Sequence, residues 1–342
     1  MQNTFNNYLR QVILLGLVIL LGGMLISQLY IFLPGLLGGV TLYILTRKWY
    51  NTLTIKKKWP KGLTAFLFII VSLVVIAIPV YFSVLLISPK IDSLIDNQQE
   101  VVKGLEAFSK KIERYTRQPL FTAANAQSIA KKITAYIPSF LNSTATILTN
   151  LIMMFFLLYY LLCSGRQIEK YLDHIIPLKP ENVEKLANET DVMIRANAIG
   201  IPIICLVQGI CAAIGYLIFG VKDWGMWGFV TGVFAFFPLV GTMIVWVPLV
   251  IYLYSINQNL TATGLTIYSI VVTGNVDYIT RLSLLKKIGN VHPMITVLGV
   301  IVGLKLFGFM GLIFGPLMIS YFIILLKIYL NEFAIKNNTT SS

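Results

Sequence analysis

The sequence predicts an all-α polytopic membrane protein with about eight transmembrane segments, two of the C-terminal ones broken or re-entrant, and a small extracytoplasmic helical insert. Of the 342 residues, 57% are hydrophobic and only 12% are charged, whereas a soluble domain carries roughly 25% charged residues. Long uncharged runs alternate with basic or Pro/Gly-rich segments. The formal net charge of +13 is explained better by membrane topology than by nucleic-acid binding, because the positive residues flank the apolar runs.

The N-terminal region, residues 1–88, is predicted to contain three membrane helices. Residues 12–33 form the first, Pro34 and Gly35 interrupt it, and a weaker apolar run follows before a third helix at 63–87. Six Lys and Arg residues lie between the second and third helices. The positive-inside rule places this loop, and therefore also the N-terminus, in the cytoplasm.

Residues 89–143 are predicted to form the extracytoplasmic insert, because Ile91, Leu94 and Ile95 recur at helical spacing in a polar stretch. Its charged residues make either a solvated face or a surface that binds a partner. The chain then continues with a fourth span, a cytoplasmic helical segment with Pro177 and Pro180 between two short helices, a C-terminal membrane core with broken helices, and a disordered tail. These regions cover residues 144–163, 164–197, 198–336 and 337–342.

Two C-terminal apolar segments, 224–255 and 291–330, are too long for a single untilted span and contain Gly and Pro residues. If each crossed the membrane once, the basic residues between them would lie outside, against the positive-inside rule. We therefore expect both segments to fold back. A pair of Gly/Pro-interrupted apolar segments is the best sequence-level indication of a transport site. The predicted helix-break residues are Pro238, Gly241, Gly308, Gly311 and Pro316.

Asp277 is the only acidic residue between Trp224 and Tyr329, and Arg281 follows one helical turn later. An acid at membrane depth is costly unless it is paired or hydrated, and such acids often bind ions or relay protons. The pair is therefore either a coupling site for a cation or proton, with Asn275 as an additional oxygen ligand, or a structural ion pair near the interface.

Two further polar residues lie in apolar surroundings. Lys305 either snorkels to the interface or meets an anionic substrate. Gln208 either makes an interhelical hydrogen bond or contacts a ligand.

The sequence gives no reason to expect an enzyme. It contains no nucleotide-binding P-loop, no GxSxG motif and no HExxH motif. We therefore expect no catalytic residues, no cofactor and no resident metal ion, and any transport should be driven by a gradient.

The C-terminal half carries an ordered set of Gly, Pro and polar motifs: Gln208-Gly209, Gly220, Gly228, Gly232, Pro238 to Thr242, Trp246, Pro248, Asp277, Arg281, His292-Pro293, Gly303, Phe307-Gly308 and Gly311 to Pro316. In their order and spacing these motifs resemble the autoinducer-2 exporter family of bacterial membrane proteins. The order of the predicted spans agrees over nearly the whole chain. This chain departs from the family at Tyr278 and Leu282, where Asn and Pro are usual.

The resemblance implies a transporter of the bacterial cell (inner) membrane with about eight spans. Its substrate would be a small signal molecule such as autoinducer-2, or a sodium or lithium ion exchanged for protons. The resemblance also implies a homo-oligomer, such as a pentamer, within the lipid bilayer and without nucleic acid. The alternative is a non-transporting scaffold that recruits partners through its outer helical insert.

Overall fold

The structure, a computed structural model, describes residues 2–96, 144–237, 240–288 and 293–330. All regular elements in these ranges are helical, which confirms the predicted all-α fold class for the described part of the chain. Five stretches are long and apolar enough to cross a membrane. They are Arg10–Lys56, Lys61–Leu86, Thr146–Ile175, Pro180–Ile218 and Val297–Tyr329, with a shorter apolar helix at Met243–Tyr254. The protein is therefore a polytopic membrane protein.

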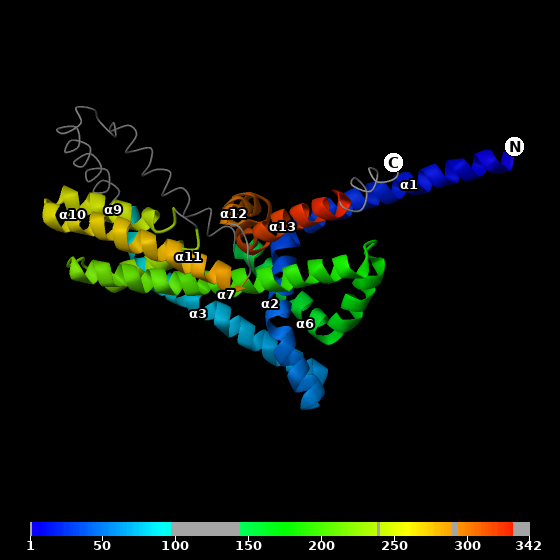
Figure 1. The fold of residues 1–342 in the computed structure, drawn as a ribbon, viewed down its shortest axis with the longest axis horizontal. Helices are drawn as coiled ribbons and strands as arrows, with labels where there is room; N and C mark the ends of the chain where they lie inside the picture. Colours follow the sequence, from blue (N-terminus) through cyan, green and yellow to red (C-terminus); the bar gives the residue numbers. More distant parts are fainter. Residues whose placement is uncertain (1, 97–143, 238–239, 289–292, 331–342) are drawn as a thin grey trace, which may run out of the picture.

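The N-terminal helices are α1 (Gln2–Leu29), α2 (Leu33–Asn51) and α3 (Lys61–Asp96). A short 3₁₀ turn, η1 (Tyr30–Phe32), separates α1 from α2, and a π turn, η2 (Thr52–Lys56), follows α2. Pro34 lies in the first turn of α2, where its missing N–H costs no helical hydrogen bond. Helix α1 extends away from the other described helices, and its apolar side chains are exposed along most of its length (Figure 1).

Two long helices form the centre of the fold: α6 (Thr144–Ile175) and α7 (Pro180–Ile218). The short helices predicted on either side of Pro177 are the ends of these two helices. Helix α7 runs along the molecule and contacts α2, α8, α11 and α13 (Figure 1). Its first half packs into a core with α2, α3, α6 and α13, and its second half into a core with α9 and α10.

The remaining helices form the C-terminal membrane core. Both long apolar segments are interrupted, the first between Phe234 and Met243 and the second at Gly308. The predicted helix break at Pro316 is wrong, because this proline lies inside a helix. Pro248 also lies inside a helix. The elements are α8 (Trp224–Phe234), α9 (Met243–Ser255), α10 (Asn259–Tyr268), the π turn η3 (Ser269–Thr273), α11 (Gly274–Ile288), α12 (Pro293–Phe307), the 3₁₀ turn η4 (Gly308–Met310) and α13 (Gly311–Tyr329).

Several predictions concern residues outside the described ranges. Most of the extracytoplasmic insert, the C-terminal tail at 337–342 and Pro238 belong to this group. The backbone of Arg281 lies in α11, but its side chain is also outside the described part.

Candidate functional site

Helices α12 and α13 form a tight hairpin that is closed by glycines. Gly299 lies against Pro316, and Gly303 lies against Gly311 and Gly315. A methyl group on any of these glycines would overlap the backbone of the opposite helix. The two backbones therefore approach as closely as small residues allow, which is the usual way in which helices associate within a membrane.

The turn of this hairpin is at Gly308. This residue has a φ of +57°, in the left-handed region that glycine adopts without steric cost. The 3₁₀ turn η4 follows, and Gly311 begins α13. Gly308 is therefore the point of chain reversal, whereas Pro316 is buried inside α13, against Gly299.

The segment between α8 and α9 makes a second close turn. Gly241 is buried there, and its N–H donates to the carbonyl oxygen of Phe237 at 3.1 Å. A Cβ atom at Gly241 would overlap the carbonyl oxygens of Phe234 and Phe237. A larger residue would therefore open this turn.

The helix interruptions meet in space, although they are far apart in the sequence. The ring of Phe236, in the α8–α9 connection, packs edge-on against Phe309 in η4 with ring centroids 5.4 Å apart. The hydroxyl of Tyr30, in η1, donates to the carbonyl oxygen of Leu306 at 2.7 Å, two residues before Gly308. Three breaks thus converge around the turn of the α12–α13 hairpin.

An asparagine that the sequence analysis does not single out stabilises the first of these breaks. Asn150 Oδ1 accepts the N–H of Gly35 at 2.9 Å. Its Nδ2 group donates to the carbonyl oxygens of Ile31 at 3.1 Å and Thr146 at 3.0 Å. Backbone groups that a helix break releases in an apolar environment need such partners. One amide of α6 therefore holds the bend between α1 and α2.

The predicted site residues of the C-terminal core occupy different environments. Asp277 is half-buried in the first turn of α11, and Asn275 is exposed, with its Nδ2 group donating to the Val271 carbonyl oxygen at 2.6 Å. Lys305 is exposed in the last turn of α12, where a positive charge is favourable beside the free carbonyl groups.

Gln208 is in the second half of α7 and has no exposed surface (0%). Among the described residues, neither its Oε1 nor its Nε2 atom has a hydrogen-bond partner. The interhelical hydrogen bond that is one of its two predicted roles is therefore absent from the described part of the chain.

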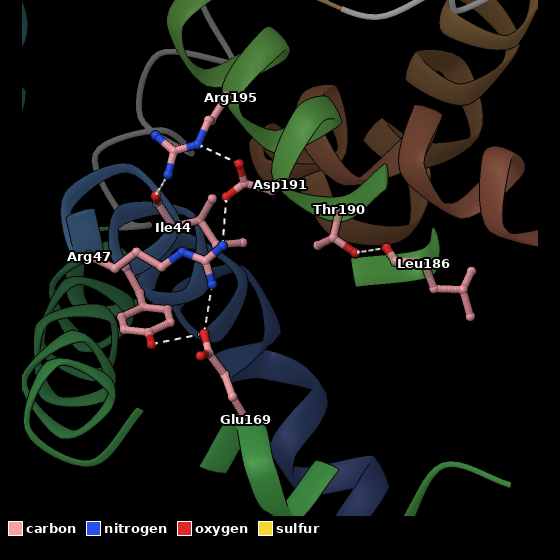
Figure 2. A network of polar contacts seen from close by, with 8 residues as sticks. Ile44, Arg47, Glu169, Leu186, Thr190, Asp191 and Arg195 are labelled. Carbon is pink, nitrogen blue, oxygen red and sulfur yellow. Dashed lines mark hydrogen bonds and ion pairs between the residues drawn. The ribbon is translucent and has the colours of Figure 1, made fainter. Parts of the chain in front are cut away.

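The structure also shows an ionic network, drawn in Figure 2, where the end of α2 meets α6 and α7. Arg47 bridges Glu169 at 2.7 Å and Asp191 at 3.0 Å. Arg195 bridges the second oxygen of Asp191 at 2.8 Å and donates to the Ile44 carbonyl oxygen. Tyr43 donates to Glu169 at 3.0 Å. The sequence shows these residues only as scattered charges at the ends of apolar runs.

The same part of α7 is also tied to α13. Ser320 donates to Glu189 Oε1 at 2.8 Å, the hydroxyls of Thr190 and Tyr321 share a hydrogen bond, and Asn197 donates to the Ile313 carbonyl oxygen at 3.4 Å. The first half of α7 thus connects the N-terminal helices on one side with the α12–α13 hairpin on the other.

These features define an all-α, multi-pass membrane protein in which broken apolar helices converge around a glycine-packed hairpin. The sequence model of a protein family described as "AI-2E family transporter" matches residues 13–331 of this chain. The chain belongs to this family, which confirms the resemblance found in the sequence.

Relatives from distant organisms carry the name "Putative transport protein". One from Helicobacter pylori strain J99 is 24% identical over 308 residues, covering 84% of this chain and 86% of that protein. One from Aquifex aeolicus is 27% identical over 315 residues, covering 85% and 87%. The relative MJ1177 from Methanocaldococcus jannaschii is 24% identical over 322 residues, covering 92% and 93%.

Proposed function

We propose that this chain is a secondary transporter of the bacterial cell (inner) membrane and not an enzyme. It uses an ion gradient to export a small polar metabolite or signal molecule, or to exchange a monovalent cation for protons, and it works as a homo-oligomer. The observation that carries the proposal is the convergence of the helix breaks around Phe236, Phe309 and Tyr30.

The convergence supports transport because broken helices are costly in a membrane. Backbone N–H and C=O groups within the hydrocarbon region need partners, so irregular backbone occurs where it is buried in protein or lines an aqueous path. Transporters place their substrate and ion sites at such discontinuous helices. In this chain α7 links the α12–α13 hairpin to the N-terminal helices.

The ionic network supports an orientation for the chain. Arg47 lies at the start of the basic loop and bonds Glu169 and Asp191, which belong to the segment between the fourth and fifth predicted spans. The network joins the two segments that the sequence assigns to the cytoplasm, which supports this assignment. We infer that this side is cytoplasmic and that the N-terminus lies there as well.

Asp277 is the proposed coupling residue. It is half-buried in the first turn of α11, immediately after the π turn η3. A carboxylate there binds a proton or a monovalent cation in turn and so couples the gradient to the solute. Arg281 follows one helical turn later in the sequence. In the proposed mechanism its positive charge neutralises the Asp277 carboxylate when no ion is bound there.

The test is flux in proteoliposomes under an imposed pH gradient, with sodium, lithium and an autoinducer-2-like sugar compared. We expect gradient-driven flux that Asp277→Asn abolishes without changing expression or oligomeric state. Asp173→Asn, at an exposed acid near the end of α6, is the matched control and should leave flux intact. Flux that survives in Asp277→Asn would remove this residue from the mechanism, and folded protein without flux for any solute would refute the transport proposal.

A further inference from the structure

The junction between α2 and α3 carries lysines that no acidic residue accompanies. Lys56, Lys57 and Lys58 follow one another at the end of η2, and Lys61 begins α3. The first acidic residue of the whole chain is Asp92. None of these four lysines forms an ion pair with a described residue. Their positive charge is therefore uncompensated within the described part of the chain.

Membrane topology alone does not require this arrangement. The positive-inside rule counts Lys and Arg residues and sets no condition on the acids beside them. In the segment between the fourth and fifth predicted spans, which the sequence assigns to the same side, cations and acids are mixed: Lys170 follows Glu169, and Lys185 follows Glu184. The absence of acids from the α2–α3 junction is therefore an additional feature, which favours contact with an anion.

The turn that carries the lysines is held by hydrogen bonds. The N–H of Trp59 donates to the Leu53 carbonyl oxygen at 3.2 Å, and the Tyr50 hydroxyl donates to the Lys61 carbonyl oxygen at 3.2 Å. Between them, Lys58 adopts a left-handed conformation with a φ of +55°. A residue other than glycine keeps this conformation only where its surroundings impose it. The backbone positions of the lysines are therefore fixed before any ligand binds, which lowers the cost of ordering them.

The junction is exposed and carries two indole rings. It lies at one end of the described structure, at the bottom of the view in Figure 1, and every residue from Ile55 to Lys61 is exposed. Trp49 is 71% exposed and Trp59 is 46% exposed, one before and one after η2. Exposed tryptophans of membrane proteins gather at the headgroup level, because their rings are apolar and their N–H groups are polar. The lysines therefore lie at the depth of the lipid headgroups.

The start of α3 adds to the positive potential. The first N–H groups of a helix have no partner within the helix, and they give its N-terminus a partial positive charge. Lys61 lies in this turn, and α3 has no acid in its first turn. An anion beside the junction would offset the lysines and the helix end together.

The apolar side chains beside the lysines indicate which anion fits. Ile55 and Leu63 flank the lysines in the sequence and are 50% and 70% exposed. A free phosphate ion would meet only the lysines and would leave these side chains in water. A phospholipid with a net negative charge brings its phosphate to the lysines and its acyl chains to the apolar residues.

We propose that the α2–α3 junction is a binding site for the headgroup of an anionic phospholipid, with Lys56, Lys57, Lys58 and Lys61 attracting the negative charge. Trp49 and Trp59 hold the site at the membrane surface. This inference goes beyond the proposed transport function, and it stands or falls independently of flux.

The test uses the full-length protein in a non-ionic detergent, with the Tm measured while phosphatidylglycerol, phosphatidylcholine or inorganic phosphate is added. The tip variant combines Lys56→Gln, Lys57→Gln and Lys58→Gln. The matched control combines Arg166→Gln, Lys170→Gln and Lys185→Gln, which removes the same number of exposed positive charges from the α6–α7 segment. A third protein replaces the three tip lysines by arginine and keeps their charge.

We expect phosphatidylglycerol to raise the Tm of the wild type in a saturable way, and to do the same for the control and the arginine variant. The tip variant should need roughly 100-fold more of this lipid for the same rise, and high salt should weaken the response of the wild type. In case the tip variant does not insert correctly, Lys57→Gln alone is tested beside it and should need roughly fivefold more. Phosphatidylcholine and inorganic phosphate should have no such effect.

Four results would overturn the proposal. Equal responses to phosphatidylglycerol and phosphatidylcholine would show that only acyl chains are recognised. An equal response to inorganic phosphate would show a site for a free anion. A response to phosphatidylglycerol that persists in the tip variant and in Lys57→Gln would remove the lysines from the site. An equal loss in the control would show that net charge matters and that its place in the fold does not.

Discussion

Placing a single methyl group at Gly303 tests whether the α12–α13 hairpin depends on direct backbone contact. In Gly303→Ala, the new Cβ atom would overlap the Gly311 carbonyl oxygen and would lie 2.6 Å from Gly315 Cα. Both neighbours are backbone atoms, so no side chain can rotate away. The helices must instead separate by roughly 1 Å to restore ordinary packing distances.

This separation sets the size of the expected effect. A gap of about 0.5–1 Å forfeits roughly a quarter to a half of the dispersion attraction between the atoms on either side. The contacts of Gly299 with Pro316 and of Gly303 with Gly311 and Gly315 lie along one seam, so they would weaken together. We expect Gly303→Ala to destabilise the protein by about 1–3 kcal/mol, the usual cost of overpacking.

The assay is equilibrium unfolding in detergent or nanodiscs, with Gly16→Ala as the matched control. Gly16 lies inside α1, and a Cβ atom added there would meet no other atom within 4 Å. Alanine at this position should leave stability unchanged or raise it by about 0.4–1 kcal/mol, because glycine loses more conformational freedom on folding. If Gly303→Ala proved as stable as Gly16→Ala, the hairpin would not be packed through its backbones, and the reasoning would be refuted.

Three other predictions concern contacts that hold separate helices together. Arg47→Ala removes the ion pairs with two partly exposed acids and should lower the free energy of unfolding by about 1–2 kcal/mol in the same assay. Lys48→Ala, at the exposed next residue, should change this free energy by almost nothing, and equal effects of the two substitutions would contradict the network. Asn150→Leu leaves backbone groups at the α1–α2 bend unpaired and should cost about 1–3 kcal/mol, and an unchanged Tm would count against this role. A double-mutant cycle of Phe236→Ala and Phe309→Ala should give a coupling energy of about 0.5–1.5 kcal/mol, and strictly additive effects would show that the two breaks do not touch.

The helical architecture and the interruption of the long apolar segments could be predicted because both depend on local sequence. Apolar runs of sufficient length form helices in lipid, where every backbone group must be paired within the segment. Gly308 could be recognised as a break for the same reason, since only glycine adopts its backbone conformation readily. Pro316 shows the limit of such local reasoning, because it continues inside α13 and packs against Gly299 instead of ending the helix.

The contacts between helices depend on distances that the sequence does not contain. Gly16 and Gly303 look equivalent in the sequence, yet one is surrounded by open space and the other touches a backbone. Arg47 bonds residues 122 and 144 positions away, so no local pattern reveals its partners. Gln208 stands out in the sequence as a polar residue in an apolar run, but only the structure shows that it is buried and has no hydrogen-bond partner among the described residues. The sequence alone thus determined the helical fold class, the interruption of the two long apolar segments and the family, because these follow from local hydropathy, backbone geometry and motif order. Only the tertiary structure decided which breaks meet, which charges pair and which buried amide has no partner among the described residues, because those depend on how distant segments pack.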